Sequence, residues 1–327
     1  METAKHDREF VRRVPGSFFT IPFGIAGLAG AWRVMTAAYG SPAAVANVLF
    51  VLAAVLWLLL VVISLARWIV AGRAFVSELR DPVDSPFWSL PAVDGMLLAG
   101  GLQPYAAGTA KVLFLVFFTG TFAVAGWIVG DWIAGGLKQH LFHPGYFLAT
   151  VAAGLIGGEE AASFGMQGLG WMSFGVGVLS WLFFGALILN RVLFAHLPGA
   201  LVPTLAIQLA APAVAGNAYF ALHGAAPDPF AYALAGYTAL SVIIELRLLS
   251  LYWPLSFAPS FWAFTFPWAA SAGLAIRWLA IERPGAGATL AAAAIGAVST
   301  LVAVIAGYSV AALVRGTLLA PGTAEAP

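Results

Sequence analysis

The residue whose type and position bear most directly on chemistry is Asp94, a carboxylate within a long apolar stretch. It follows Pro91 by three residues, and a proline in a helix leaves backbone carbonyl groups without hydrogen-bond partners. Those carbonyls and the carboxylate together could bind a cation or a proton. An ion pair of Asp94 with Arg33 or Lys111 inside a helical bundle is an equally good interpretation. Because a charged side chain within a membrane span is costly, Asp94 is a candidate functional residue.

Two adjacent carboxylates follow a pair of glycines further along the chain. Glu159 and Glu160 come directly after Gly157 and Gly158. This position suits a wet vestibule, but a solvated loop is the favoured interpretation. We name Glu159 with Asp94 as a possible proton or ion site.

One more acidic residue lies in an apolar stretch. Glu245 precedes Arg247 by two residues, and side chains two apart lie on different faces of a helix. We expect each of them to pair with a neighbour or to extend toward the membrane surface.

The sequence lacks the motifs of enzymes and of metal or cofactor sites. His140 and His143 are three residues apart, but no third ligand has suitable spacing, so solvated loop histidines are the better interpretation. The chain has no cysteine, no Gly-x-Ser-x-Gly, no His-Glu-x-x-His and no phosphate-binding Gly-rich lysine motif. We therefore expect no catalytic residue, no metal, no cofactor and no intrinsic coupling to ATP. A net charge of +1 without a basic cluster argues against nucleic acid.

The composition indicates which elements must position these residues. Hydrophobic residues make up 61% of the 327 residues and charged residues 9%, a balance that places the chain in a lipid bilayer. A spanning helix needs roughly 20 apolar residues, and stretches of this kind predict an all-α membrane protein of about ten transmembrane helices. The predicted spans are 18–39, 43–71, 87–104, 108–134, 145–160, 168–194, 199–223, 229–252, 259–281 and 288–315. The domain division is a tail at 1–17, a transmembrane domain at 18–319 and a tail at 320–327.

The distribution of cationic residues predicts the orientation. Ten spans place both termini on one side, and most Lys and Arg residues, including Arg12 and Arg13, then fall on that side. Because cytoplasmic loops are enriched in Lys and Arg, we expect both termini in the cytoplasm. A count of eight or nine spans would put Arg191, His196 and Arg247 on the wrong side.

Proline residues fall inside the odd-numbered spans, while the even-numbered spans are almost free of them. The odd-span prolines are Pro22, Pro91, Pro203, Pro212 and Pro267. Broken helices are tolerated at membrane depth where the freed backbone groups face protein or a water-filled cavity. The pattern predicts five hairpins around an axis, with odd helices inside and even helices facing lipid. The alternative is that proline is simply common in transmembrane helices.

An aromatic cluster precedes one of these prolines. Phe264 and Phe266 lie two residues apart, and Pro267 follows directly. One ring could face the axis and block ions by excluding water. From spacing alone, aromatic packing is the better interpretation.

Several segments, in order along the chain, resemble the tellurite-resistance and dicarboxylate transporter family, which includes bacterial tellurite-resistance proteins, fungal malate and sulfite permeases and plant slow anion channels. The segments that carry the resemblance are 14–25, 79–91, 143–148, 207–213, 236–248 and 260–268. The resemblance covers nearly the whole chain. The sequence departs from the family pattern at Asn190-Arg191 and in the charges of Asp94 and Glu245.

The resemblance implies ten helices in five tandem hairpins around a central pore, as a homotrimer in a bacterial inner membrane. By match to the family segment, Phe266 is the expected pore gate, with Phe264 one helix face away. Phe264, Pro22, Pro91, Pro212 and Pro267 are expected to line or kink the pore. The implied activity is voltage-independent or weakly gated passage of small inorganic or organic anions across the lipid bilayer.

Two other functions stay open at this point. The first is a proton-coupled carrier of C4-dicarboxylates, tellurite or sulfite, in which Asp94 or Glu159 binds the proton. The second is a non-conducting membrane scaffold or sensor. The sequence does not name the anion, because many anions need only a lumen of suitable width and potential.

Overall fold

A computed structural model describes residues 14–135 and 137–318 of the chain. The described residues form helices and connecting turns, with no β-strand among them. The tail at 320–327 and all but the last residues of the tail at 1–17 lie outside the described residues. The all-α fold class is therefore confirmed for the described part of the chain.

Five α-helices form the middle of the bundle, and each is preceded by a tighter or wider helical segment. The inner α-helices are α2 (Thr20–Tyr39), α4 (Leu90–Leu102), α6 (Ala153–Ser163), α8 (Ile207–His223) and α10 (Thr265–Glu282). The preceding 3-10 segments are η1 (Gly16–Phe19), η2 (Ser85–Ser89), η6 (Gly199–Ala206) and η7 (Pro259–Phe264), and α6 follows the 3-10 turn η4 (Pro144–Tyr146) and the π-helical segment η5 (Leu148–Ala152). A further 3-10 turn, η3 (Gln139–Leu141), lies in the connection before η4.

The prolines explain where several of these transitions occur. Pro22, Pro91 and Pro267 each lie in the first turn of an inner α-helix. A proline is tolerated there because its missing N–H would have no partner within the helix. Pro212 lies inside α8, where it removes one helical hydrogen bond. The expected breaks therefore coincide with a change from 3-10 to α-helix at Pro22, Pro91 and Pro267, whereas α8 continues past Pro212.

The remaining helices are longer and carry no interior proline. They are α3 (Ala43–Leu79), α5 (Ala107–Gly135), α7 (Gln167–Phe194), α9 (Pro229–Tyr252) and α11 (Gly287–Val314). Large apolar side chains on these helices are exposed, for example Ile69, Ile133 and Phe183. Such surfaces suit contact with lipid rather than water.

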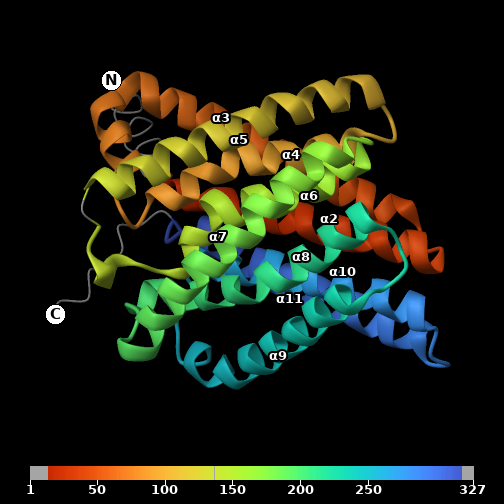
Figure 1. Cartoon of the computed structure of the whole chain (residues 1–327). Coiled ribbons are helices and arrows are strands. Elements are labelled where there is room, and N and C mark those ends of the chain that lie inside the picture. Colours follow the sequence, from red (N-terminus) through yellow and green to blue (C-terminus); the bar gives the residue numbers. More distant parts are fainter. Residues whose placement is uncertain (1–13, 136, 319–327) are drawn as a thin grey trace.

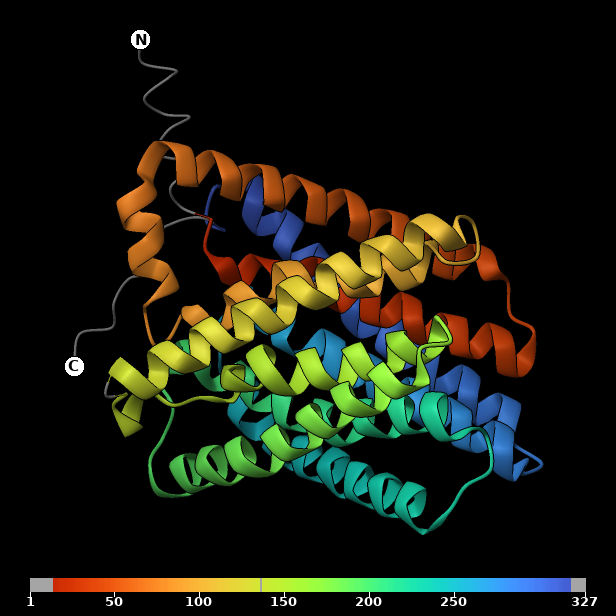
Figure 2. The same ribbon diagram turned by 45° about the horizontal axis from the view of Figure 1, so that its top comes forward.

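The inner helices pack in a closed order. Helix α2 contacts α4, α4 contacts α6, α6 contacts α8, α8 contacts α10, and α10 returns to α2. Figures 1 and 2 show α2, α8 and α10 in the middle, with α3 and α5 along one side and α9 along the opposite side. Each outer helix follows an inner helix in the chain, so inner and outer helices alternate.

Seven helical segments of the described chain are long and apolar enough to cross a membrane: Gly16–Tyr39, Ala43–Arg73, Ala107–Gly135, Gln167–Phe194, Gly199–His223, Pro229–Tyr252 and Gly287–Val314. The spans predicted at 87–104, 145–160 and 259–281 are not among them. Helix α4 has 13 residues and α6 has 11, because part of each predicted span is 3-10 or π-helical. Helix α10 carries Arg277 and Glu282 within its 18 residues.

A bend in α3 brings the end of this helix against the start of η1, the segment that precedes α2. The backbone at Ala71 leaves the helical region, with φ −136° and ψ 39°. The end of α3 turns back, so Glu78 pairs with Arg67 and its other oxygen accepts a 3.2 Å hydrogen bond from the Gly16 N–H. Arg67 also donates to the Val14 carbonyl. The start of η1 is thus held by a largely buried ion pair.

Candidate functional site

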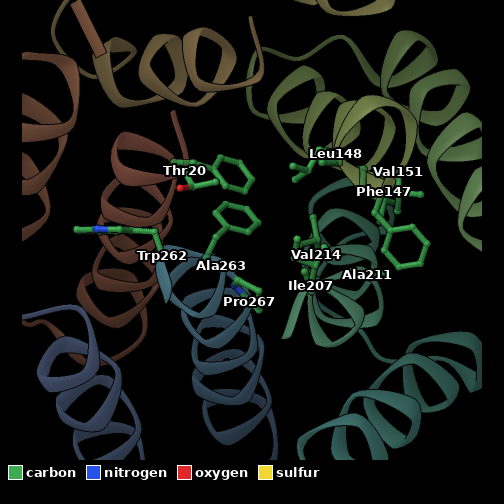
Figure 3. A pocket seen from close by; sticks show the side chains of 15 residues that line it. Thr20, Phe147, Leu148, Val151, Ile207, Ala211, Val214, Trp262, Ala263 and Pro267 are labelled. Carbon is green, nitrogen blue, oxygen red and sulfur yellow. The ribbon is translucent and has the colours of Figure 1, made fainter. Parts of the chain in front are cut away.

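A small apolar cavity lies where the first turns of the inner helices meet. Its volume is about 40 Å³, and its lining comes from α2, η5, α6, α8, η7 and α10. Figure 3 shows Thr20, Ala263 and Pro267 on one side of it and Leu148 and Val214 on the other. The lining contains no ionisable side chain. The cavity therefore offers almost nothing but hydrocarbon to a passing molecule.

A second cavity lies among the later turns of the same helices. It has a volume of about 230 Å³, and α2, α4, α6, α8 and α10 all contribute to its lining. Its charged residues are Arg33, Glu159, Glu160 and Arg277. The polar content is therefore concentrated at this end.

Phe266 and Val214 line both cavities. Phe266 is the second residue of α10, at the junction between η7 and the α-helix. Its ring is 7% exposed and stacks on Phe23, with centroids 3.8 Å apart and planes 13° from parallel. Phe266 therefore lies, together with Val214, beside both the apolar and the charged cavity.

The absence of a side chain at Gly27 leaves space for the Phe266 ring. A Cβ at Gly27 would lie 2.6 Å from Cδ2 of Phe266, which is too close without movement of the ring. Gly30, one turn later on the same helix, has no atom within 4 Å of such a Cβ. Helix α2 therefore contacts the ring closely at Gly27 and leaves open space at Gly30.

The lining residues also give the direction of the inner helices. Thr20, Ile207 and Pro267, from the first turns of α2, α8 and α10, line the apolar cavity. Arg33 and Arg277, from later turns, line the charged cavity. The helices thus run parallel, and the positive ends of their dipoles meet at the apolar cavity.

The charged cavity contains both signs of charge. Arg33 donates hydrogen bonds to the carbonyl oxygens of Gly100 (2.9 Å) and Gly101 (3.3 Å). Arg277 lies 3.9 Å from Glu159, measured from Nη2 to Oε1, with about a third of each side chain exposed. Glu159 and Glu160 belong to α6, which continues to Ser163. The favoured expectation of a solvated loop at these two residues is therefore wrong.

Asn217 adds a free acceptor to this cavity. Its side-chain N–H₂ donates to the carbonyl oxygens of Ala213 and Ala270, both at 3.0 Å. Because both donors are used, the orientation of the amide is fixed, and Oδ1 has no partner within the described part of the chain. Asn217 is 6% exposed and joins α8 to α10.

Asp94 is completely buried in α4 and lines neither cavity. Neither of its carboxylate oxygens has a hydrogen-bond partner among the described residues. The alternative in which Asp94 pairs with Arg33 or Lys111 is therefore wrong, because Arg33 bonds to α4 carbonyl groups instead. A role in binding a proton or an ion stays a prediction.

Phe264 lines neither of the two cavities, and its expected role in lining or kinking the pore stays a prediction. Its ring packs edge-on against Tyr252, with centroids 4.8 Å apart, and against Phe261. Two residues apart in a helix means roughly 200° of rotation, so only one of the two phenylalanines can face the axis. Among the candidate prolines, Pro267 lines the apolar cavity, whereas Pro22 and Pro91, in the first turns of α2 and α4, and Pro212, inside α8, lie outside both linings.

His143 lies outside the spanning helices and is buried, so the expectation of a solvated loop histidine is wrong here. Its Nδ1 accepts the N–H of Gly145 and its Nε2 donates to the carbonyl oxygen of Val83, both at 3.1 Å. Burial lowers the pKa of His143 to about 4. The neutral imidazole thus connects the loop before η5 to the loop before η2.

Several residues of the site were not anticipated from the sequence: Phe23, Gly27, Val214 and Asn217. Phe23 carried a usable signal, because it directly follows Pro22 just as Phe266 directly precedes Pro267. Each aromatic ring therefore lies at a break in an inner helix.

Comparisons with known proteins match most of the chain. The profile of a family described as voltage-dependent anion channel matches residues 13–317. The chain is also 27% identical over 263 residues to a tellurite resistance protein TehA homolog of Haemophilus influenzae, with 80% of each chain covered. The matched family region contains all five inner helices and both cavities.

Proposed function

The chain belongs to the voltage-dependent anion channel family, and on that premise we propose that it carries small anions through the axis of its inner helices, with Phe266 as the gate. Membership of this family and the apolar outer helices make it a membrane-integral protein of the anion-transport class. The observation that carries the proposal is the shared position of Phe266 in the linings of the apolar and charged cavities.

The proposed architecture is five tandem hairpins around a pore. It is supported by the alternation of broken inner helices with continuous outer ones and by the closed packing order of the inner helices. In this arrangement α4, α6 and α10 cross the membrane together with their preceding segments. We further propose a homotrimer in a bacterial inner membrane, with the transmembrane domain at 18–319 and both termini in the cytoplasm.

The attraction for anions in this proposal comes from backbone and not from fixed cations. The positive ends of the inner helices meet at the apolar cavity, whose lining has no ionisable side chain. Helix N-termini act as partial positive charges that favour anions. The apolar walls and the Phe266 ring exclude water, so the pore is closed to hydrated ions until the ring moves.

Planar-bilayer recordings of purified protein test the proposal, with chloride, nitrate and malate in turn. We expect Phe266→Ala to raise anion conductance roughly tenfold or more, because the hydrophobic barrier is removed. Phe264→Ala is the matched control, since Phe264 is equally buried but faces away from both cavities. Equal currents from the two variants, or no current from either, would contradict the gate and favour a non-conducting scaffold or sensor.

A proton-coupled carrier is the second candidate, and the carboxylates of the charged cavity favour it. Glu159 and Glu160 line this cavity beside Arg277. A carboxylate that gains and loses a proton there could couple the movement of malate, sulfite or tellurite to protons. Uptake into proteoliposomes under an imposed pH gradient, compared with Glu159→Gln and Asp94→Asn, tests this candidate. Loss of pH-driven uptake in either variant would support it.

A further inference from the structure

A lateral groove lies on the outer side of α10, between α9 and α11. It has a volume of about 750 Å³ and is lined by residues of α9, η7, α10 and α11. Most of the lining is apolar or aromatic, including Leu249, Trp253, Phe261, Trp268 and Val298. Helix α9 packs on α8, whereas α11 packs on α10 and α2. The groove is therefore the space that these two outer helices leave open over α10.

One carboxylate lies in this groove. Glu245 of α9 is 3% exposed and accepts a 3.0 Å hydrogen bond from the Tyr252 hydroxyl. No Arg, Lys or His side chain of the described chain forms an ion pair with it. Arg247 bonds instead to Ser250, on the exposed side of the helix. A carboxylate without a cation in an apolar membrane span is costly and points to a ligand that balances it.

We propose that the groove binds a single-chain amphiphilic ammonium, with its nitrogen at Glu245 and its hydrocarbon chain along the apolar walls. Charge complementarity favours an ammonium head over a neutral lipid chain, which would leave the carboxylate unmatched. The lining of α11 runs from Ala294 to Tyr308, about 20 Å at 1.5 Å per residue. This length accommodates an extended alkyl chain.

The depth of Glu245 favours a free amine over an aminophospholipid. Glu245 is seven residues before Tyr252, the last residue of α9, and lies about 10 Å from that helix end. An aminophospholipid whose ammonium reached this depth would bring its phosphate into the apolar groove beside a carboxylate. A single-chain amine carries no such phosphate.

A ligand bound in the groove would contact α10, the helix that carries Phe266. Trp268, Ser271 and Ala272 of α10 line the groove, whereas Phe266 and Ala269 of the same helix line the charged cavity. A ligand in the groove therefore contacts the helix that carries Phe266 from behind. This coupling rests on the proposed function, while the binding itself does not.

The test measures binding without measuring current. Radiolabelled dodecylamine is titrated against the full chain in phosphatidylcholine nanodiscs, with dodecanol and phosphatidylethanolamine as competitors. We expect saturable binding that Glu245→Gln weakens about tenfold, through loss of a charge pair. Ala297→Trp, which fills the groove from the exposed face of α11, should abolish it. Glu282→Gln, an exposed glutamate outside the groove, is the matched control.

Each contrary result overturns the proposal in a distinct way. Equal binding to wild type and Glu245→Gln, or equal competition by dodecanol, would show an apolar crevice without charge recognition. Stronger competition by phosphatidylethanolamine would identify a phospholipid site. Because the chain has no cysteine, a single Ala297→Cys can be oxidised, and a disulfide-linked dimer would show that a second copy covers the groove. In a separate planar-bilayer recording, a current that dodecylamine leaves unchanged would contradict the coupling to Phe266 but not the binding site.

Discussion

The rings of Phe23 and Phe266 lie face to face, with centroids 3.8 Å apart and planes 13° from parallel. The two residues come from the first and last of the inner helices, α2 and α10, and both lie directly beside a proline at a helix break. The stack therefore holds the Phe266 ring where the apolar and charged cavities meet. A stacked aromatic pair contributes only about 0.5–1.5 kcal/mol beyond its burial, so the ring is held but not locked.

Removing the Phe23 ring should make the Phe266 ring more mobile while leaving it in the chain. We expect Phe23→Ala to raise anion conductance by about two- to tenfold, less than Phe266→Ala, because the stacking energy converts to factors of this size. Single-channel recording separates the two effects, since Phe23→Ala should increase the fraction of time open. A conductance identical to wild type would show that Phe23 does not hold the gating ring.

Crowding the Phe266 ring from the same helix, one turn after Phe23, gives an independent prediction. In Gly27→Ala the new Cβ would lie 2.6 Å from Phe266, so the ring must move or α2 must shift. We expect altered basal conductance together with a loss of stability of about 1–3 kcal/mol, as in other overpacked cores. Gly30→Ala is the control, because open space surrounds that position and the residue lines the same charged cavity. Identical current and unfolding midpoint in both variants would contradict the close contact.

The broken inner helices could be predicted from the sequence because their cause is local. A proline in the first turn of an α-helix acts through its own backbone, so Pro22, Pro91 and Pro267 marked the transitions directly. The gate residue could not be predicted from local sequence in this way, because spacing alone does not decide whether Phe264 or Phe266 faces the axis. The family resemblance indicated Phe266. The ring of Phe264 packs against Tyr252 instead of lining either cavity.

Two errors in the sequence-based interpretation concern residues whose partners are distant in the chain. Two glutamates after two glycines look like a loop, yet α6 continues through them, and Arg277 of α10 lies 3.9 Å from Glu159. His143 beside Pro144 looks solvated, yet it is buried because the carbonyl oxygen of Val83 accepts its Nε2 hydrogen. No local pattern reports such partners.

The Arg277–Glu159 pair should tune the passage of anions once the gate is removed. In a Phe266→Ala background, Glu159→Gln leaves Arg277 less neutralised, so anion conductance at low salt should rise about two- to fivefold, as expected for a partly exposed ion pair. Arg277→Gln should change conductance in the opposite direction. Both effects should shrink at 1 M salt, where the Debye length is about 3 Å. A salt-independent change would indicate a structural effect instead.

The ion pair that holds the start of η1 should matter for stability. Glu78→Gln leaves Arg67, which is 8% exposed, without its counter-charge. Removing one partner of a buried pair costs roughly 3 kcal/mol or more, so the midpoint of thermal unfolding in detergent should fall clearly below that of wild type. Glu282→Gln serves as the exposed control. Unchanged midpoints in both variants would show that the Arg67–Glu78 pair does not stabilise the fold.

Acidification should destabilise the fold through His143. Its folded pKa is about 4 and its ordinary value is 6.5, so between these two values the unfolded chain binds the proton more readily than the folded protein. Stability from His143 is therefore complete above pH 6.5 and is lost as the pH falls toward 4. The difference corresponds to about 3 kcal/mol. The geometry gives the same sign, because a proton on Nδ1 would remove the acceptor of the Gly145 N–H.

The carboxyl group of Asp84 gives stability the opposite pH dependence, so the experiment must separate the contribution of His143 from it. Burial, followed by the charges of Asp81 and Glu78, raises the pKa of Asp84 to about 6, and its stabilising effect is lost as the pH rises from 3.8 toward 6. Both wild type and His143→Asn contain Asp84, so the difference between their pH-dependent shifts in unfolding midpoint cancels the contribution of Asp84. Asparagine keeps a short polar side chain that can accept the Gly145 N–H but does not titrate. Unfolding midpoints at pH 7.5 and 4.5 should differ more for wild type than for His143→Asn, and parallel shifts would show that His143 does not set the acid sensitivity.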